Sequence, residues 1–210
     1  MQKPIILGSS SIWRARVLKN AGIPFTASAA DIDEKAIRFP RAEDLVRNIA
    51  VAKAGELLRR ISEPSLLITA DQVVEVEVAA GPGPEFVDVH EKPSSAGEAR
   101  LWLTGMHRLV AMKSVTAVFV TDTNTRRSRH VVDVVVINRK KIPEDAIKRA
   151  IKRGDIMQSC GAFTLDDPDI GQYFSNGTDG LSELEFQTSV AGLPIGKTLE
   201  LLESFGWRRS

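Results

Sequence analysis

A group of hydroxyl and guanidinium side chains follows the first apolar run of the chain. The stretch reads IILGSSSIWRAR over residues 5–16, and Ser9 and Ser11 precede Arg14. Hydroxyls and the unpaired backbone N–H groups at a helix start donate hydrogen bonds to anions, and arginine binds phosphate through a two-pronged fork. The stretch therefore predicts a phosphate site at a strand-to-helix turn. The alternative is a serine N-cap in front of a solvated helix face.

A lysine interrupts the apolar face of a long predicted helix. At 100° per residue, residues 41–61 form an amphipathic helix with one apolar stripe, and Lys53 lies in the middle of that stripe. One interpretation is a lysine that extends along the core edge into solvent. The other is a lysine that reaches an anionic ligand, because burying an unpaired ammonium is costly.

Asp71 and Gln72 interrupt a run that otherwise reads as a buried strand, LLITADQVVEVEV at residues 66–78. Their side chains must point to opposite faces of that strand. Aspartate is depleted in strand interiors, and Val73 and Val74 follow at once, which makes an ordinary strand end a weak explanation. A carboxylate in this place can coordinate a metal or deprotonate water.

Two further stretches carry charges of the same kind. The acidic DIDE at residues 31–34 offers Glu34 as a Mg²⁺ ligand, or else forms a helix start or a solvated loop. In HEKP at residues 90–93, Pro93 holds Lys92 in an extended conformation, where it can neutralise a phosphate. Cations for the phosphates, a metal held by carboxylates and a base for water are what phosphoryl chemistry requires.

The elements that must position these side chains alternate between strand and helix. We predict strands at 3–8, 23–30, 66–78, 113–123, 129–139 and 181–190, and helices at 12–21, 41–61, 95–106, 143–154 and 193–206. Residues 79–93 and 161–182 read as loops, DTNT turns a central hairpin, and Ser95 with Glu98 marks a helix start. The pattern predicts an α/β or α+β fold with a mixed sheet.

Composition limits the classes of protein and partner. The chain has 210 residues and a formal net charge of +1, which provides no overall attraction to nucleic acid or acidic membranes. Its one cysteine, Cys160, excludes an intramolecular disulfide, and no apolar run is long enough to span a membrane. We therefore expect a cytoplasmic protein that binds neither nucleic acid nor membrane.

The order of motifs resembles the Maf family of nucleoside triphosphate pyrophosphatases. The motifs occur in this order along the chain: LGSSSxWR, DxDE, AxxKA, ADQ, EKP, CGAF and GLPIGKT. The resemblance covers nearly the whole chain, from Leu7 to Trp207. The resemblance implies one domain over residues 1–210, with an elongated mixed sheet, flanking helices and two lobes around a cleft. It implies cleavage of a nucleoside triphosphate between the α and β phosphates, a divalent metal such as Mg²⁺, and a homodimer.

The resemblance also assigns roles to residues that match the family's motifs. It implies Asp71 as the proton acceptor and, with Glu34, as metal ligand. The substrate-binding residues that it implies are Ser9, Ser11, Arg14, Lys53 and Lys92.

Three positions resemble the branch of the family that prefers 7-methyl-GTP: Trp13, Gln72 and Asp166. A tryptophan face attracts the cationic methylated guanine, and a carboxylate accepts hydrogen bonds from its N–H groups. Two alternatives remain open at these positions. Trp13 is an aromatic residue of the core instead of a contact to the base, or Asp167 takes the role of Asp166. A pyrophosphatase for dTTP, UTP or CTP and a non-catalytic nucleotide-binding regulator of cell division are open alternatives for the function.

Overall fold

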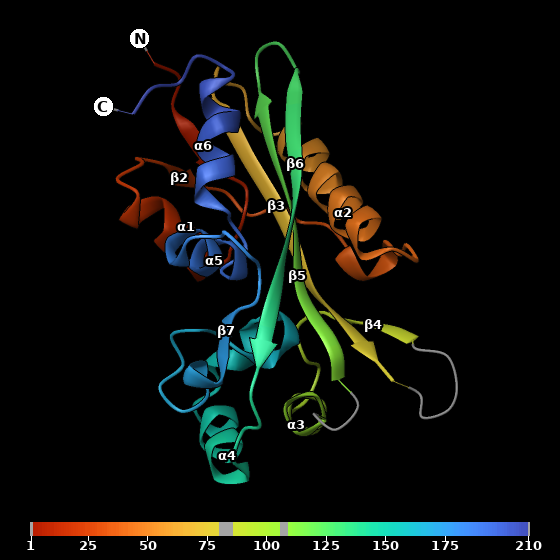
Figure 1. Cartoon of the computed structure of the whole chain (residues 1–210). Coiled ribbons are helices and arrows are strands. Elements are labelled where there is room, and N and C mark those ends of the chain that lie inside the picture. Colours follow the sequence, from red (N-terminus) through yellow and green to blue (C-terminus); the bar gives the residue numbers. More distant parts are fainter. Residues whose placement is uncertain (1, 80–85, 106–108, 210) are drawn as a thin grey trace. The chain divides into compact units, whose positions relative to one another are not determined.

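The computed structural model describes residues 2–79, 86–105 and 109–209, and its elements are labelled in Figure 1. The helices are α1 (Ile12–Asn20), α2 (Ala42–Leu57), α3 (Ala96–Thr104), α4 (Glu144–Arg153), α5 (Glu183–Val190) and α6 (Ile195–Glu203). The strands are β1 (Ile5–Leu7), β2 (Thr26–Ala27), β3 (Leu66–Val78), β4 (Phe86–His90), β5 (Leu109–Asp122), β6 (Ser128–Arg139) and β7 (Phe174–Asn176). No helix in the described ranges has the length and apolarity needed to cross a membrane.

The strands form a mixed seven-stranded sheet, which confirms the predicted fold class. Its order is β2-β1-β3-β5-β6-β7, and β4 also pairs with β3. β1 runs parallel to β2 and to β3, whereas β4 is antiparallel to β3 and β7 is antiparallel to β6. The chain divides into two compact units, and β3, β5 and β6 each contribute to both.

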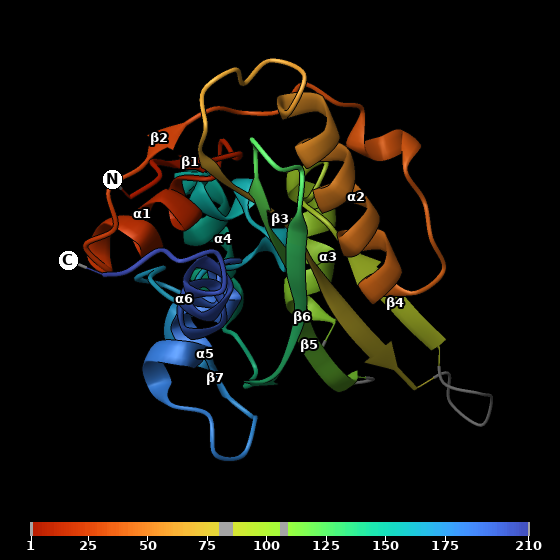
Figure 2. The same cartoon turned by 90° about the horizontal axis from the view of Figure 1, so that it is seen from above.

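The first unit comprises Met1–Asp71, Thr116–Asp133 and Ala191–Ser210. α1 and α6 pack on one side of its part of the sheet, against a core that includes Ile5, Leu7 and Ile68. α2 packs against the neighbouring residues of the same strands, among them Leu67. Because alternate residues of a strand point to opposite faces, the sheet lies between α2 and the pair α1 and α6 (Figure 2).

The second unit comprises Gln72–Val115 and Val134–Val190. α3, α4 and α5 supply Leu103, Ile147 and Phe186 to its core, which also contains Val76 and Ile137 of the sheet. α4 begins after Pro143 and ends at Gly154, which has a φ of 92°. Both boundaries match the sequence prediction, because proline is tolerated at a helix start and glycine adopts the left-handed conformation at a helix end.

Three predictions about elements are wrong. The predicted loop at 161–182 contains β7 (Phe174–Asn176), which pairs with β6. Residues 181–190 do not form a strand, because α5 occupies Glu183–Val190. Ser182 and Glu185 form a reciprocal capping box, in which each side chain accepts a hydrogen bond from the other residue's backbone N–H. The predicted loop at 79–93 contains β4, which pairs with β3. Residues 80–85 of that loop, and residue 106 of the predicted helix 95–106, lie outside the described residues.

Candidate active site

The turn after β1 brings the chain very close to β3. The N–H of Gly8 donates a hydrogen bond of 2.7 Å to the carbonyl of Ile68. A Cβ atom at Gly8 would lie 2.6 Å from Leu57 Cδ1 and 2.7 Å from Thr69 Cγ2, so any other residue would displace these two side chains. The close approach places Ser9 beside the part of β3 that leads to Asp71.

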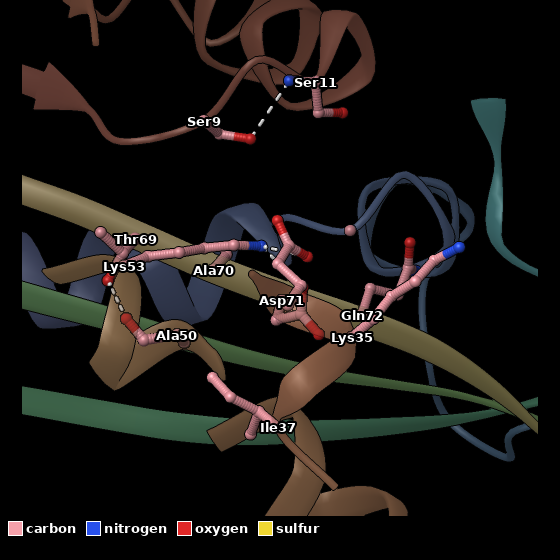
Figure 3. Close-up of polar contacts among 12 residues, drawn as sticks. Ser9, Ser11, Lys35, Ile37, Ala50, Lys53, Thr69, Ala70, Asp71 and Gln72 are labelled. Atoms are coloured by element: carbon pink, nitrogen blue, oxygen red, sulfur yellow. Dashed lines mark hydrogen bonds and ion pairs between the residues drawn. The ribbon is translucent and has the colours of Figure 1, made fainter. Parts of the chain in front are cut away.

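The serines organise the start of α1. Ser11 is the N-cap of this helix, and its hydroxyl accepts a hydrogen bond from the backbone N–H of Arg14. The N–H of Ser11 in turn donates to the hydroxyl of Ser9, at 3.2 Å (Figure 3). The N-cap prediction is therefore confirmed, and both hydroxyls also retain a proton that can be donated to a ligand.

Arg14 is buried and holds three segments of the first unit together. Its Nε donates to the carbonyl of Gly192 at 2.9 Å, and its Nη1 donates to the carbonyl of Ala70 at 2.8 Å and to Ser9 Oγ at 3.2 Å. Nη2 donates no hydrogen bond to the residues that the structure describes. Arg14 is therefore partly structural, and Nη2 is the nitrogen that it can offer to an anion.

Lys53 reaches from α2 to Asp71 on β3 (Figure 3). Its ammonium lies 2.8 Å from Asp71 Oδ1 and 3.1 Å from Oε2 of Glu34, which begins the short helix η1 (Glu34–Ala36). The side chains of Lys53 and Asp71 are each only 9% exposed, so this lysine does not extend into solvent. One cation thus lies between two carboxylates, and of its three N–H groups one remains for a phosphate oxygen.

Burial dominates the ionisation of Asp71. Loss of hydration raises the pKa of this carboxyl above its ordinary value, whereas the positive charges of Lys53 and Arg14 lower the pKa and the negative charge of Glu34 raises it. A carboxyl with a raised pKa is a better proton acceptor than an ordinary aspartate. The environment of Asp71 therefore suits a general base.

The topology places this cluster where α/β proteins bind ligands. β1 is the middle of three parallel strands, and the connections on its two sides use helices on opposite faces of the sheet. In open α/β sheets, ligands bind beyond the carboxyl ends of strands at such a switch point. Ser9, Ser11 and Arg14 follow β1 directly, and Asp71 lies on the neighbouring strand.

The acidic groups fit a metal bound together with a substrate. Among residues 2–79, 86–105 and 109–209, no group of three or more His, Cys, Asp or Glu side chains is arranged to hold a metal ion. Glu34 and Asp71 already face one shared cation, the ammonium of Lys53. Mg²⁺ commonly binds through one or two carboxylates together with substrate phosphates, so these two residues are compatible with that mode.

The second unit contains three of the predicted residues. Gln72 directs its amide nitrogen at Ser114 and at the end of α5, Lys92 is exposed, and Asp166 is exposed. Asp167, the alternative to Asp166, is buried, and both of its oxygens accept hydrogen bonds of 2.8 Å from Nη2 of Arg153. This engagement makes Asp167 a structural residue.

Trp13 is partly exposed on α1, and the guanidinium carbon of Arg16 lies 4.7 Å from the centre of its ring. A cation of the protein itself therefore already lies over the indole ring of Trp13. The indole nitrogen of Trp13 is buried and has no hydrogen-bond partner among the described residues.

Sequence reasoning missed two contacts that shape the site. The carbonyl of Gly192 accepts a hydrogen bond from Arg14. The carbonyls of Ser189 and Val190, at the end of α5, accept hydrogen bonds from Gln72. All of these acceptors are backbone carbonyls, which every residue carries, so no residue type in the sequence marks them. The GLPIGKT motif that begins with Gly192 was the only indication that this loop matters.

The chain is similar to known proteins over most of its length. A family model described as "Maf-like protein" matches residues 4–205. A 7-methyl-GTP pyrophosphatase of Dictyostelium discoideum is 37% identical over 173 residues, which cover 78% of this chain and 82% of that protein. A dTTP/UTP pyrophosphatase of Desulforamulus reducens is 28% identical over 97% of both chains, and a 7-methyl-GTP pyrophosphatase of Pseudomonas aeruginosa is 25% identical over 94% of both. With a family match that spans both units, this chain belongs to the Maf-like protein family.

Proposed function

We propose that this protein is a nucleoside triphosphate pyrophosphatase that acts on 7-methyl-GTP and releases the nucleoside monophosphate and pyrophosphate. The observation that carries the proposal is the buried Lys53–Asp71 pair, joined by Glu34, beside the serine turn and Arg14. The names of similar proteins support both the reaction and the substrate. The dTTP/UTP pyrophosphatases among the relatives make those pyrimidine nucleotides the second candidate substrates.

In the proposed reaction, Asp71 accepts a proton from the water that attacks the α phosphorus. The hydroxyls of Ser9 and Ser11, Nη2 of Arg14 and the third N–H of Lys53 bind phosphate oxygens, and Lys92 contributes a further positive charge. These groups stabilise the negative charge that develops on the departing pyrophosphate, which is the largest catalytic effect expected here.

We propose that the reaction also requires a divalent metal ion, preferably Mg²⁺. Glu34 and Asp71 would hold it together with the triphosphate, because both carboxylates already face one cation. When bound, such an ion supplies Lewis acidity and neutralises phosphate charge.

Substrate choice is assigned to two of the three branch positions, Trp13 and Asp166. We propose that Trp13 contributes a ring face that attracts a cation, and that Asp166 contributes a carboxylate that can accept the N–H groups of guanine. Gln72, the third branch position, donates the hydrogen bonds of its amide nitrogen to groups inside the protein. The cytoplasm is the compartment that we propose for the protein.

The test is a substrate panel with the purified full chain, Mg²⁺ and either 7-methyl-GTP, dTTP, UTP or CTP. We expect pyrophosphate release to be fastest with 7-methyl-GTP. Faster turnover of a pyrimidine nucleotide would replace the proposed substrate, and tight binding without turnover of any nucleotide would favour a regulator over an enzyme.

Asp71→Asn tests the general base in the same assay. We expect kcat to fall about 10²- to 10⁴-fold, because the amide does not accept the proton of water at neutral pH. The matched control is Asp179→Asn, at an exposed position of the second unit. Circular dichroism would establish that both variants are folded. If folded Asp71→Asn retains the wild-type kcat, Asp71 is not the general base.

A further inference from the structure

The amide nitrogen of Gln72 is fully used inside the protein. It donates to Ser114 Oγ at 2.7 Å, to the carbonyl of Val190 at 2.9 Å and to the carbonyl of Ser189 at 3.0 Å. An amide nitrogen has two N–H groups, so three acceptors leave none of them free for a ligand. Ser189 and Val190 end α5, where backbone carbonyls lack partners within the helix. Gln72 therefore caps the carboxyl end of α5.

The backbone around Asp71 is held by side chains as well. The carbonyl of Gln72 accepts a hydrogen bond from the thiol of Cys160 at 3.0 Å. The carbonyl of Ala70, on the other side of Asp71, accepts the 2.8 Å hydrogen bond from Arg14. The carboxylate of Asp71 is itself paired with Lys53. Three consecutive residues of β3 are thus fastened by side chains from elsewhere in the chain.

We propose that Gln72 is a positioning residue for Asp71: by capping α5 and bonding Ser114, it fixes the strand segment from which the Asp71 carboxylate projects. The proposal rests on the function proposed above. Asp71 and Gln72 point to opposite faces of β3, so Gln72 acts through the backbone that the two residues share. Because the amide nitrogen is occupied, Gln72 does not use it to read the base, and its loss affects different nucleotides alike.

The experiment compares the wild type with Gln72→Met, which keeps the length of the side chain and removes its hydrogen bonds. Gln187→Met is the matched control, since Gln187 is exposed on α5 itself and, among the described residues, donates only to Glu183 of the same helix. We expect Gln72→Met to lower kcat about 10- to 100-fold for 7-methyl-GTP and for dTTP, with KM little changed, because small misplacements of a reacting group are costly. Gln187→Met should have wild-type kinetics.

Hydrogen exchange provides a readout that is independent of activity. In Gln72→Met we expect faster amide exchange in peptides that cover residues 66–74 and 183–192, and no such change in Gln187→Met. If the wild type hydrolyses none of the nucleotides, the proposed function fails, while the exchange data still decide whether Gln72 fastens these two segments.

Two results would overturn the proposal. One is a wild-type kcat in folded Gln72→Met. The other is a rise in KM for 7-methyl-GTP alone, which would show that Gln72 reads the base directly. If Gln72→Met does not fold, Gln72→Asn takes its place under the same criteria, because the shorter side chain withdraws the amide from α5 while remaining polar.

Discussion

At the scale of single residues, the site depends on the balance of charge around one buried carboxylate. Desolvation raises the pKa of Asp71, and its neighbours act in opposite directions: Lys53 and Arg14 lower the pKa, and Glu34 raises it. A general base works only when ionised, so with Asp71 in the proposed role we expect turnover to fall as the pH falls through the pKa of Asp71. The acidic limb of the pH–rate profile therefore reports directly on these neighbours.

Two substitutions should move that limb in opposite directions. Glu34→Gln removes a negative neighbour, which lowers the pKa of Asp71 and shifts the acidic limb of kcat/KM to lower pH. Lys53→Met removes a positive neighbour, which raises the pKa and shifts the limb to higher pH. The measurement is kcat/KM against pH for the proposed substrate, with exposed Lys152→Met as control. Shifts in the same direction, or none, would show that Asp71 does not set the limb.

At the scale of elements, the turn after β1 depends on the contact between the end of β1 and the neighbouring elements. A side chain at Gly8 would have to displace the side chains of Leu57 on α2 and Thr69 on β3. The same contact aligns Leu7 with Ile68, and thereby sets Ser9 level with the residues that lead to Asp71. Here a glycine is required by packing and not by an unusual backbone angle.

Gly8→Ala should therefore destabilise the protein, by about 1–3 kcal/mol, because the added methyl group overfills a packed core. Gly55→Ala is the matched control on α2, where an added Cβ meets nothing within 4 Å. That substitution should stabilise the protein by about 0.5–1 kcal/mol, since alanine is the better helix former. Urea unfolding measures both free energies. Equal effects would show that the close approach at Gly8 is unimportant.

At the scale of the whole molecule, the predicted residues are divided between two compact units. Ser9, Ser11, Arg14, Glu34, Lys53 and Asp71 belong to the first unit, and Gln72, Lys92 and Asp166 belong to the second. The boundary in β3 falls between Asp71 and Gln72. The predicted cleft, the single domain and the homodimer remain predictions at this scale.

We expect the chain to form a homodimer through the hairpin of β5 and β6. Val134 on β6 is an exposed apolar residue that such an interface would cover. Val134→Asp should then convert the dimer to a monomer, because a buried unpaired charge opposes association. Light scattering after size-exclusion chromatography measures the mass, with exposed Leu184→Asp as control. A monomeric wild type would refute the prediction.

Much of the fold was predictable because its signals are local. The strand at Leu66–Val78 was predicted with its observed boundaries, and Ser95 caps α3 as the Ser/Glu spacing indicates. The errors have local causes too. In LSELEFQTSV the β-branched and aromatic residues favoured a strand, although Ser182 and Glu185 carry the capping-box signal of a helix.

The sequence by itself determined which side chains were available and, through the ordered motifs, the family to which the chain belongs. Only the tertiary structure decided their partners. Lys53 and Asp71 lie 18 positions apart, and the choice between a lysine in solvent and a lysine on a carboxylate depends on how α2 packs on β3. Arg14 and Gln72 are anchored by backbone carbonyls, which carry no residue-specific signal and acquire their positions only when the chain folds.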